Sequence, residues 1–199
     1  GLAITAHLVA LGHKPKLWLS GGLRSFKDGY QANGEINCFV PKDRLTTSIE
    51  DAMTEAECIF IATPGMSHSQ IASEIKPFLV RESLVFLTPG RAFGARYFHS
   101  MLGESSRSVS ILEAETELHA CRVTERGVFV SGIKALVKFC GRGPEDVSRF
   151  AQAVPHNYLK RYEASPNPLE ITLGNVSYVL HCIAAIKFAE KSQNSPKNI

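Results

Sequence analysis

Several features that would narrow the function quickly are missing from this sequence of 199 residues. No apolar run approaches the roughly 18 to 20 residues that a membrane-spanning helix needs, and the start of the chain lacks the basic region of a signal peptide. The net charge is only +3 and is scattered, so neither nucleic acid nor a membrane is indicated as a partner. The five cysteines are dispersed and form no CxxC pair. We therefore expect a cytoplasmic protein with reduced thiols, no disulfide framework and no bound metal.

The most informative stretch, residues 57–94, contains two short apolar runs that end in the same three-residue turn. Residues 58–62 stop at Thr63-Pro64-Gly65, and residues 84–87 stop at Thr88-Pro89-Gly90. Uninterrupted apolar runs of this kind are typical of strands buried on both faces of a parallel sheet. The residues between them have helical spacing, which completes a βαβ unit. Ligands of such sheets lie outside the carboxyl ends of the strands, so we expect Thr63, Pro64 and Pro89 to bind a cofactor.

The N-terminal residues predict the rest of a doubly wound, Rossmann-like α/β fold. Residues 1–12 have the pattern of a helix that stops at Gly12, and a strand follows over residues 16–20. In a dinucleotide-binding fold, an earlier strand ends in GxGxxG, and the last glycine opens this helix. Gly1 stands where that glycine would be. We therefore expect the chain to lack the first strand and most of the glycine loop, and we expect Gly1, Leu2 and Ala3 to contact the cofactor.

The end of the second strand bears on the choice between NAD and NADP. NAD-binding versions of the fold usually have an acidic residue here, whereas NADP-binding versions supply an arginine. In this sequence Ser20 and two glycines precede Arg24, and no acid appears before Asp28. A hydroxyl and a guanidinium suit a 2′-phosphate. We predict NADP as the cofactor, with NAD as the alternative if Arg24 is only a solvated loop cation.

The remaining pattern predicts helices before and after the βαβ unit and an antiparallel extension of the sheet. His68, next to the first Thr-Pro-Gly turn, could reach a cofactor, but we interpret it as an exposed residue in the first turn of a helix. The expected helices cover residues 49–56, 94–102 and 144–153, and the expected strands cover residues 35–40, 108–112, 127–130 and 135–139.

A well-marked helix begins near the C-terminus. Asn167 suits the N-cap, Pro168 the first helical position and Glu170 a variant capping box. Asn175, Tyr178 and His181 follow at intervals of three along one face, where His181 taken alone is interpreted as a core histidine. An apolar stripe predicted to face the core consists of Leu169, Leu173, Val176, Leu180 and Ile183.

Two segments resemble the opine dehydrogenase family. The run Glu113-Ala-Glu-Thr-Glu-Leu-His-Ala-Cys-Arg122, followed by Gly132-Ile-Lys134, resembles the closing part of that family's nucleotide domain. The run Asn175-Val-Ser-Tyr-Val-Leu-His181 resembles the first helix of its α-helical substrate domain. The resemblance covers nearly the whole chain. It implies a dinucleotide-binding domain over residues 1–160 and the start of a substrate domain over residues 165–199.

The resemblance also implies a reaction, the NAD(P)H-dependent reductive condensation of an amino acid with a 2-oxo acid. In that family a helix histidine handles a proton and polarises the keto oxygen, which implies this catalytic role for His181 with Asn175 as its polar companion. Two points depart from the family pattern. Cys182 stands where a proline is common, and the acid that partners the histidine would lie beyond Ile199, so the chain alone is expected to be inactive.

Two other classes of function stay open. Another reductase of the same superfamily, of the glycerol-phosphate or ketopantoate type, would share the βαβ core but use a lysine of the substrate helix, and Lys187 lies close to the end of the chain for that role. A non-catalytic nucleotide-binding module would share the core as well. The oligomeric state is open, with a homodimer as one possibility.

Overall fold

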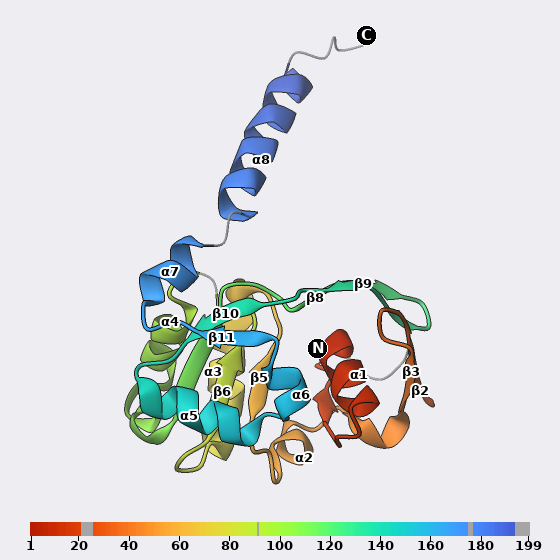
Figure 1. The fold of residues 1–199 in the computed structure, drawn as a ribbon, viewed down its shortest axis with the longest axis vertical. Helices are drawn as coiled ribbons and strands as arrows, with labels where there is room; N and C mark the ends of the chain where they lie inside the picture. Colours follow the sequence, from red (N-terminus) through yellow and green to blue (C-terminus); the bar gives the residue numbers. More distant parts are fainter. Residues whose placement is uncertain (21–25, 91, 175–176, 194–199) are drawn as a thin grey trace.

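The computed structural model describes residues 1–20, 26–90, 92–174 and 177–193, with only the backbone given for residues 177–179 and 190–193. Figure 1 shows an α/β body from which one long helix projects. The central sheet of the body has five strands in the order β11-β10-β7-β6-β5. These strands are β5 (Ile59–Ile61), β6 (Leu84–Leu87), β7 (Ser110–Ala114), β10 (Val137–Cys140) and β11 (Tyr162–Ala164).

Helices cover both faces of the central sheet, which confirms the doubly wound fold. β5, β6 and β7 run parallel, and β10 runs antiparallel to β7, as the expected extension requires. On one face Phe86 and Leu112 pack against α1 (Leu2–Ala10), α5 (Pro144–Ala153) and α6 (His156–Leu159). On the other face Val85, Leu87 and Ile111 pack against α3 (His68–Ile75) and α4 (Gly94–Leu102). The buried runs thus supply both layers, because successive strand residues point to opposite faces.

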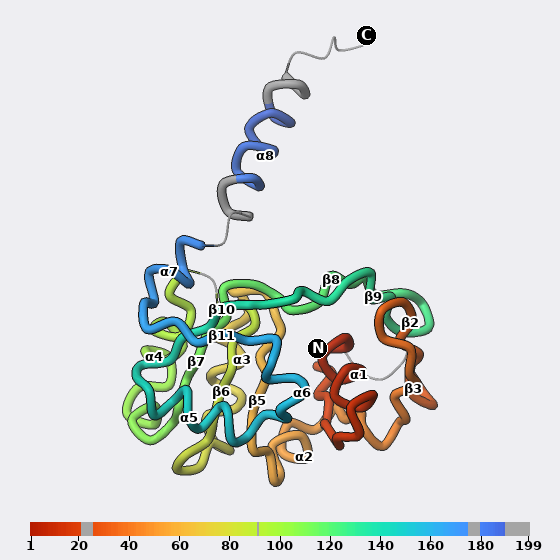
Figure 2. The backbone as a smooth tube through the Cα atoms, viewed as in Figure 1, coloured from red at the N-terminus to blue at the C-terminus, as the bar shows by residue number. Residues whose placement is uncertain are grey.

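A second sheet, with the order β3-β2-β9-β8, lies on the far side of α1. Its strands are β2 (Gly29–Gly34), β3 (Cys38–Pro41), β8 (His119–Thr124) and β9 (Gly127–Ile133). Figure 2 shows the β8–β9 hairpin passing over α1 to reach β2. Ala3 and Ala6 of α1 pack on this sheet while Leu8 packs on the central one, so α1 is apolar on nearly every side.

This second sheet corrects part of the expectation from sequence. The strand near residue 128 does not extend the central sheet, because it pairs in parallel with β2 instead. Residues 29–34 form a strand that was not predicted from the sequence. Gly127 has a φ of +150°, and a Cβ there would lie 2.0 Å from the carbonyl oxygen of Gln31, so the pairing requires glycine at this point. The strand expected over residues 35–40 is shorter and shifted to residues 38–41.

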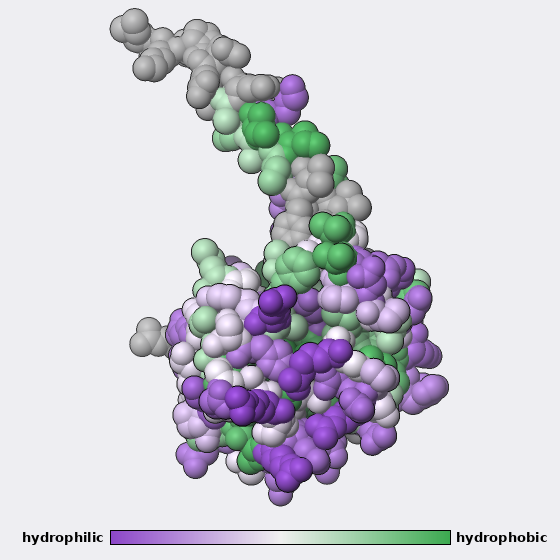
Figure 3. All heavy atoms as spheres, turned by 90° about the vertical axis from the view of Figure 1, so that its left-hand side faces the viewer, coloured by the Kyte–Doolittle hydropathy of each residue, from purple (hydrophilic) through white to green (hydrophobic). Residues whose placement is uncertain are grey.

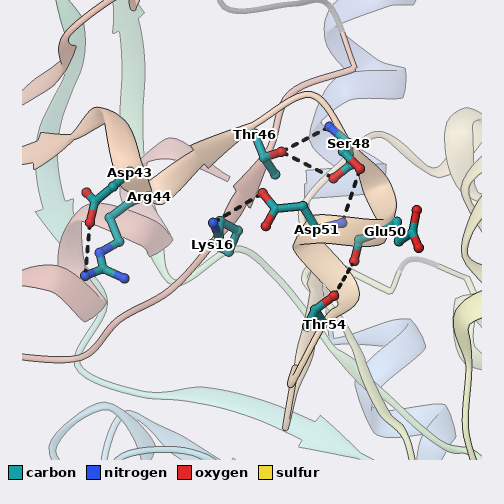
Figure 4. A network of polar contacts seen from close by, with 8 residues as sticks. All are labelled: Lys16, Asp43, Arg44, Thr46, Ser48, Glu50, Asp51 and Thr54. Carbon is teal, nitrogen blue, oxygen red and sulfur yellow. Dashed lines mark hydrogen bonds and ion pairs between the residues drawn. The ribbon is translucent and has the colours of Figure 1, made fainter.

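The segment before β5 contains a short parallel pair, β1 (Leu17–Trp18) and β4 (Leu45–Thr46), followed by α2 (Ile49–Met53). Figure 4 shows the polar contacts that fix the start of α2. Ser48 caps the helix as predicted, because its Oγ accepts a hydrogen bond from the Asp51 amide at 3.2 Å. The Asp51 carboxylate also pairs with the Lys16 ammonium at 3.2 Å. Short 3-10 helices complete the body at Lys42–Arg44, Gly65–Ser67, Lys76–Phe78 and Gly103–Ser108.

The C-terminal segment forms two helices instead of the one predicted, α7 (Pro168–Leu173) and α8 (Ser177–Gln193). Asn167 caps α7 as expected, since its side chain accepts from the Leu169 amide at 3.0 Å. Glu170 does not close a capping box, because it binds the Lys138 ammonium and the Ser165 hydroxyl. α7 ends at Gly174, where a Cβ would come within 2.7 Å of the Glu170 carbonyl oxygen.

The predicted core stripe of this segment is exposed. Leu173, the last residue of α7, keeps 76% of its surface accessible. Leu180 keeps 59%, because α8 projects from the body. Figure 3 shows hydrophobic spheres along this projecting helix. Val176 lies outside the described residues. None of the described helices is both long enough and apolar enough to cross a membrane.

Candidate functional site

A cleft of about 600 Å³ opens at the carboxyl edge of the central sheet. Three parts of the chain form its walls: the first turn of α1, the two Thr-Pro-Gly turns that follow β5 and β6, and the segment that leads into β8. The position agrees with the rule for open α/β sheets, in which ligands bind beyond the carboxyl ends of the strands. Of the residues predicted to bind the cofactor, those that line the cleft are Gly1, Ala3, Thr63, Pro64 and Pro89.

The first wall is the N-terminus of α1. Gly1 is the N-cap and provides no side-chain cap, and the first helical backbone bond runs from the Thr5 amide to the Gly1 carbonyl at 3.0 Å. The amides of the first turn therefore have no partner within the helix and favour an anion. A Cβ at Gly1 would lie 3.1 Å from Leu17 Cδ1, so glycine allows close packing of α1 on β1. The Leu2 side chain faces the second sheet and does not line the cleft, although its carbonyl oxygen accepts from the Tyr30 hydroxyl at 2.6 Å.

The second wall begins with the turn after β5. Thr63 lines the cleft, and its Oγ1 is buried without a hydrogen-bond partner among the described residues. Buried hydroxyls are normally hydrogen-bonded, so this oxygen is available to a ligand. Pro64 and Met66 continue the wall, and Met66 keeps 89% of its surface exposed at the mouth.

The turn after β6 completes the second wall and is fixed from behind by Glu113. Pro89 follows a cis peptide bond, and the Gly90 amide donates to the Ala114 carbonyl at 3.0 Å. A Cβ at Gly90 would lie 2.3 Å from Glu113 Cβ, so no larger residue fits against this side chain. Glu113 is buried and accepts from the Ala95 amide at 2.9 Å at the start of α4. Burial raises the pKa of this carboxyl despite the bonds from the α4 backbone.

The third wall was not assigned from sequence. It consists of Glu117, Leu118, His119 and Cys121, all within the run that carries the resemblance stated above. His119 is buried, and its Nε2 lies 2.9 Å from Nδ1 of His7 on α1. Burial, with a smaller effect from the His7 ring, lowers the pKa of His119 to about 3. The feature of the sequence that could have indicated this wall is the cluster of polar residues just before a strand. The sequence does not show that this strand lies beside α1, because tertiary structure brings them together.

Other predicted site residues are not brought to this cleft. Ser20 is exposed and does not line it. His181 is exposed on α8 and does not line it either. Arg24 and Asn175 lie outside the described residues. The structure also corrects the interpretation of His68, which is only 1% exposed because the first turn of α3 packs under α4 with its ring against Phe98.

The chemistry available in the cleft is that of binding and orientation. Free helix amides suit phosphates, the Thr63 hydroxyl suits a polar group, and the two prolines offer flat apolar surfaces for rings. Within the described ranges, no three side chains among His, Cys, Asp and Glu are placed to hold a metal ion. The residues present therefore fit a dinucleotide.

Comparison with known proteins gives related sequences. No family model matches the chain. The chain is 30% identical over 154 residues to an opine dehydrogenase of Arthrobacter sp., which covers 76% of this chain and 43% of that protein. It is 26% identical over 145 residues to vitopine synthase of Allorhizobium ampelinum, which covers 72% of this chain and 39% of that protein. The chain thus spans less than half the length of these two relatives.

Comparison with solved structures gives the fold. An octopine dehydrogenase solved with NADH and pyruvate matches with a TM-score of 0.63 and 20% identity, covering 90% of this chain and 47% of that one. A glycerol-3-phosphate dehydrogenase from Coxiella burnetii matches with a TM-score of 0.55 and 12% identity, covering 83% of this chain and 50% of that one. At these identities the solved structures establish a shared fold alone. The chain is therefore similar in sequence to an opine dehydrogenase and to vitopine synthase, and it shares the fold of octopine dehydrogenase and of glycerol-3-phosphate dehydrogenase.

Proposed function

We propose that the protein is an NAD(P)H-dependent opine dehydrogenase. In this reaction the amino group of an amino acid attacks the carbonyl carbon of a 2-oxo acid, water leaves, and the resulting imine takes up a hydride and a proton to give a secondary amine. The observation that carries the proposal is the coincidence of a cleft at the carboxyl edge of the central sheet with a sequence 30% identical to an opine dehydrogenase. Neither feature alone would specify the reaction, because the fold supports many chemistries.

The cleft residues have defined roles in this proposal. The amides of the first turn of α1 hold the pyrophosphate, Thr63 Oγ1 accepts or donates one hydrogen bond, and Pro64 and Pro89 contact ring faces. The dinucleotide supplies the hydride when bound, and the chain binds it and excludes water. The choice of NADP over NAD rests on Ser20 and Arg24, as argued from the sequence.

The catalytic part of the proposal concerns α8. We propose that His181 exchanges a proton with the substrate and polarises its keto oxygen, with Asn175 as its polar companion. In the structure His181 is exposed on the projecting helix, so the proposal requires α8 to come over the cleft when substrate binds.

The domain division belongs to the proposal as well, with residues 1–160 binding the dinucleotide and residues 165–199 beginning the substrate domain. α7 is fastened to the body, because Glu170 binds the Lys138 ammonium and the Phe93 amide donates to Thr172 Oγ1 at 3.2 Å. Movement of α8 relative to the cleft would therefore occur after α7, at Gly174.

A homodimer also remains part of the proposal, and sedimentation velocity would measure the oligomeric state.

The test is amine-dependent oxidation of NADPH and NADH by the purified full-length protein. Pyruvate is supplied as the 2-oxo acid with a panel of amino acids, including arginine, and mass spectrometry identifies the secondary amine. Oxidation that requires both substrates supports the proposal.

A second candidate, a reductase of the glycerol-phosphate or ketopantoate type, is favoured by the fold shared with glycerol-3-phosphate dehydrogenase. Oxidation with dihydroxyacetone phosphate or ketopantoate, without any amine, would support this candidate and contradict the first. Dinucleotide binding without turnover on any of these substrates would support a non-catalytic module.

A further inference from the structure

A pair of histidines lies behind the third wall of the cleft. His7 comes from α1 and His119 from the start of β8, 112 positions later in the chain. Nδ1 of His7 and Nε2 of His119 are 2.9 Å apart, and the ring planes meet at 81°. This hydrogen bond joins the helix that begins at Gly1 to the strand that closes the opposite side of the cleft.

Both rings pack against the same aromatic residue, Tyr158. The Tyr158 ring centroid lies 5.1 Å from that of His7 and 6.3 Å from that of His119. Burial disfavours the charged form of each histidine, and Arg161 beside His7 adds to the effect. The pair is therefore a hydrogen bond between two neutral imidazoles. In such a bond one nitrogen donates and the other accepts, so each ring fixes the tautomer and orientation of the other.

The two histidines differ in their relation to the cleft. His119 lines it together with Gly1, Ala3 and Ile4 of the first turn of α1, whereas His7 does not line it. The phosphates of a dinucleotide belong at that helix terminus. His119 therefore stands where the sugar–phosphate part of the dinucleotide would pass, and its ring is held from behind by His7.

We propose that His119 is a further binding residue of this cleft, contacting the sugar–phosphate part of the dinucleotide, and that His7 is the positioning residue that orients it. The inference rests on the proposed function, because it takes a dinucleotide as the ligand. Packing alone gives no reason for two imidazoles here, since burying polar rings costs free energy that an apolar pair would avoid. A hydrogen bond that fixes one ring at the surface of a binding cleft gives such a reason.

The test compares three substitutions in the purified full-length protein by fluorescence titration with NADH and NADPH. His7→Leu removes the donor or acceptor and should weaken binding about fivefold to tenfold, the loss of one hydrogen bond. His7→Gln keeps a side-chain amide that can donate or accept a hydrogen bond, so its Kd should stay within about twofold of the wild-type value. His119→Phe keeps the packing on Tyr158 and should weaken binding at least as much as His7→Leu. His13→Leu is the matched control, because His13 is exposed just after the same helix.

Melting temperatures separate positioning from a purely structural role. A structural role predicts that His7→Leu and His7→Gln lose thermal stability together while the Kd for the dinucleotide stays unchanged, and this outcome would overturn the inference. Unchanged Kd values in both His7→Leu and His119→Phe would overturn it as well. If His7→Leu does not fold, His119→Phe carries the test. A wild-type protein that binds neither nucleotide refutes the proposed function itself, whereas binding that no substitution weakens refutes this inference alone.

Discussion

The first and last helices of the chain are both rich in apolar residues, yet they lie in opposite environments. α1 is enclosed between two sheets, and Ala6 has no exposed surface. α8 projects from the body, and Leu180, Ile183 and Ile186 each keep more than half of their surface exposed. The comparison separates two roles of apolar sequence. α1 forms one wall of the cleft, whereas α8 leaves its apolar side chains and His181 exposed.

The first prediction is that a substitution in α8 affects turnover and leaves dinucleotide binding in the cleft unchanged. In the full-length protein, His181→Ala should lower turnover by about 10² to 10⁴, the usual loss for one positioned acid–base group. The Kd of NADPH should stay within about twofold, because His181 does not line the cleft. Near-normal turnover with every amino acid and 2-oxo acid pair would remove His181 from the mechanism.

The second prediction compares how much a carboxylate in α1 and a carboxylate in α8 change the free energy of unfolding. Ala6→Asp places a carboxylate between two sheets and should destabilise the chain by about 4 kcal/mol or more. The matched substitution Leu180→Asp in α8 should change the free energy of unfolding by less than about 0.5 kcal/mol in the 199-residue chain. Urea unfolding measures both values. A large loss for Leu180→Asp would mean that α8 packs on the body.

The third prediction concerns the choice of cofactor. Arg24→Ala should raise the KM for NADPH by about tenfold to a hundredfold, since one charged contact to a phosphate contributes about 1.5 to 3 kcal/mol. The KM for NADH should not change. A wild-type enzyme that already prefers NADH would contradict the assignment of Arg24.

The fourth and smallest effect is the pH dependence of stability from the His7–His119 pair. Burial lowers the pKa of both histidines below their ordinary value of 6.5. Below that pH the unfolded chain takes up protons that the folded chain does not, so stability is full above about pH 6.5 and falls as the pH drops toward 3. Arg161, a cation near His7, acts in the same direction.

Thermal unfolding at a series of pH values between 7.5 and about 5 measures this dependence. His119→Phe should flatten the curve relative to the wild type, whereas the exposed control His13→Leu should leave it unchanged. Equal slopes for His119→Phe and the wild type would show that the pair does not titrate in this way.

The strands, turns and site residues that could be predicted from the sequence are those determined by residues close together in the chain. β5, β6 and their turns follow from runs of neighbouring residues, and three of the predicted cofactor residues, Thr63, Pro64 and Pro89, lie together for that reason. The third wall could not be predicted, because β8 reaches α1 through its partner β9, and β9 pairs with β2, 96 positions earlier in the chain (Gln31 opposite Gly127). His68 was misjudged because its burial depends on α4. The break at Gly174 was missed because the apolar spacing continues across it.

The central claim is that the first turn of α1 and the two Thr-Pro-Gly turns bind a nicotinamide dinucleotide. A crystal structure of the full-length protein with NADPH tests it most directly. We predict the pyrophosphate at the amides of the first turn of α1, Thr63 Oγ1 within hydrogen-bond distance of the ligand, and His119 beside its sugar–phosphate part. A dinucleotide bound elsewhere, with Thr63 and the α1 amides left without contact to it, would contradict the account.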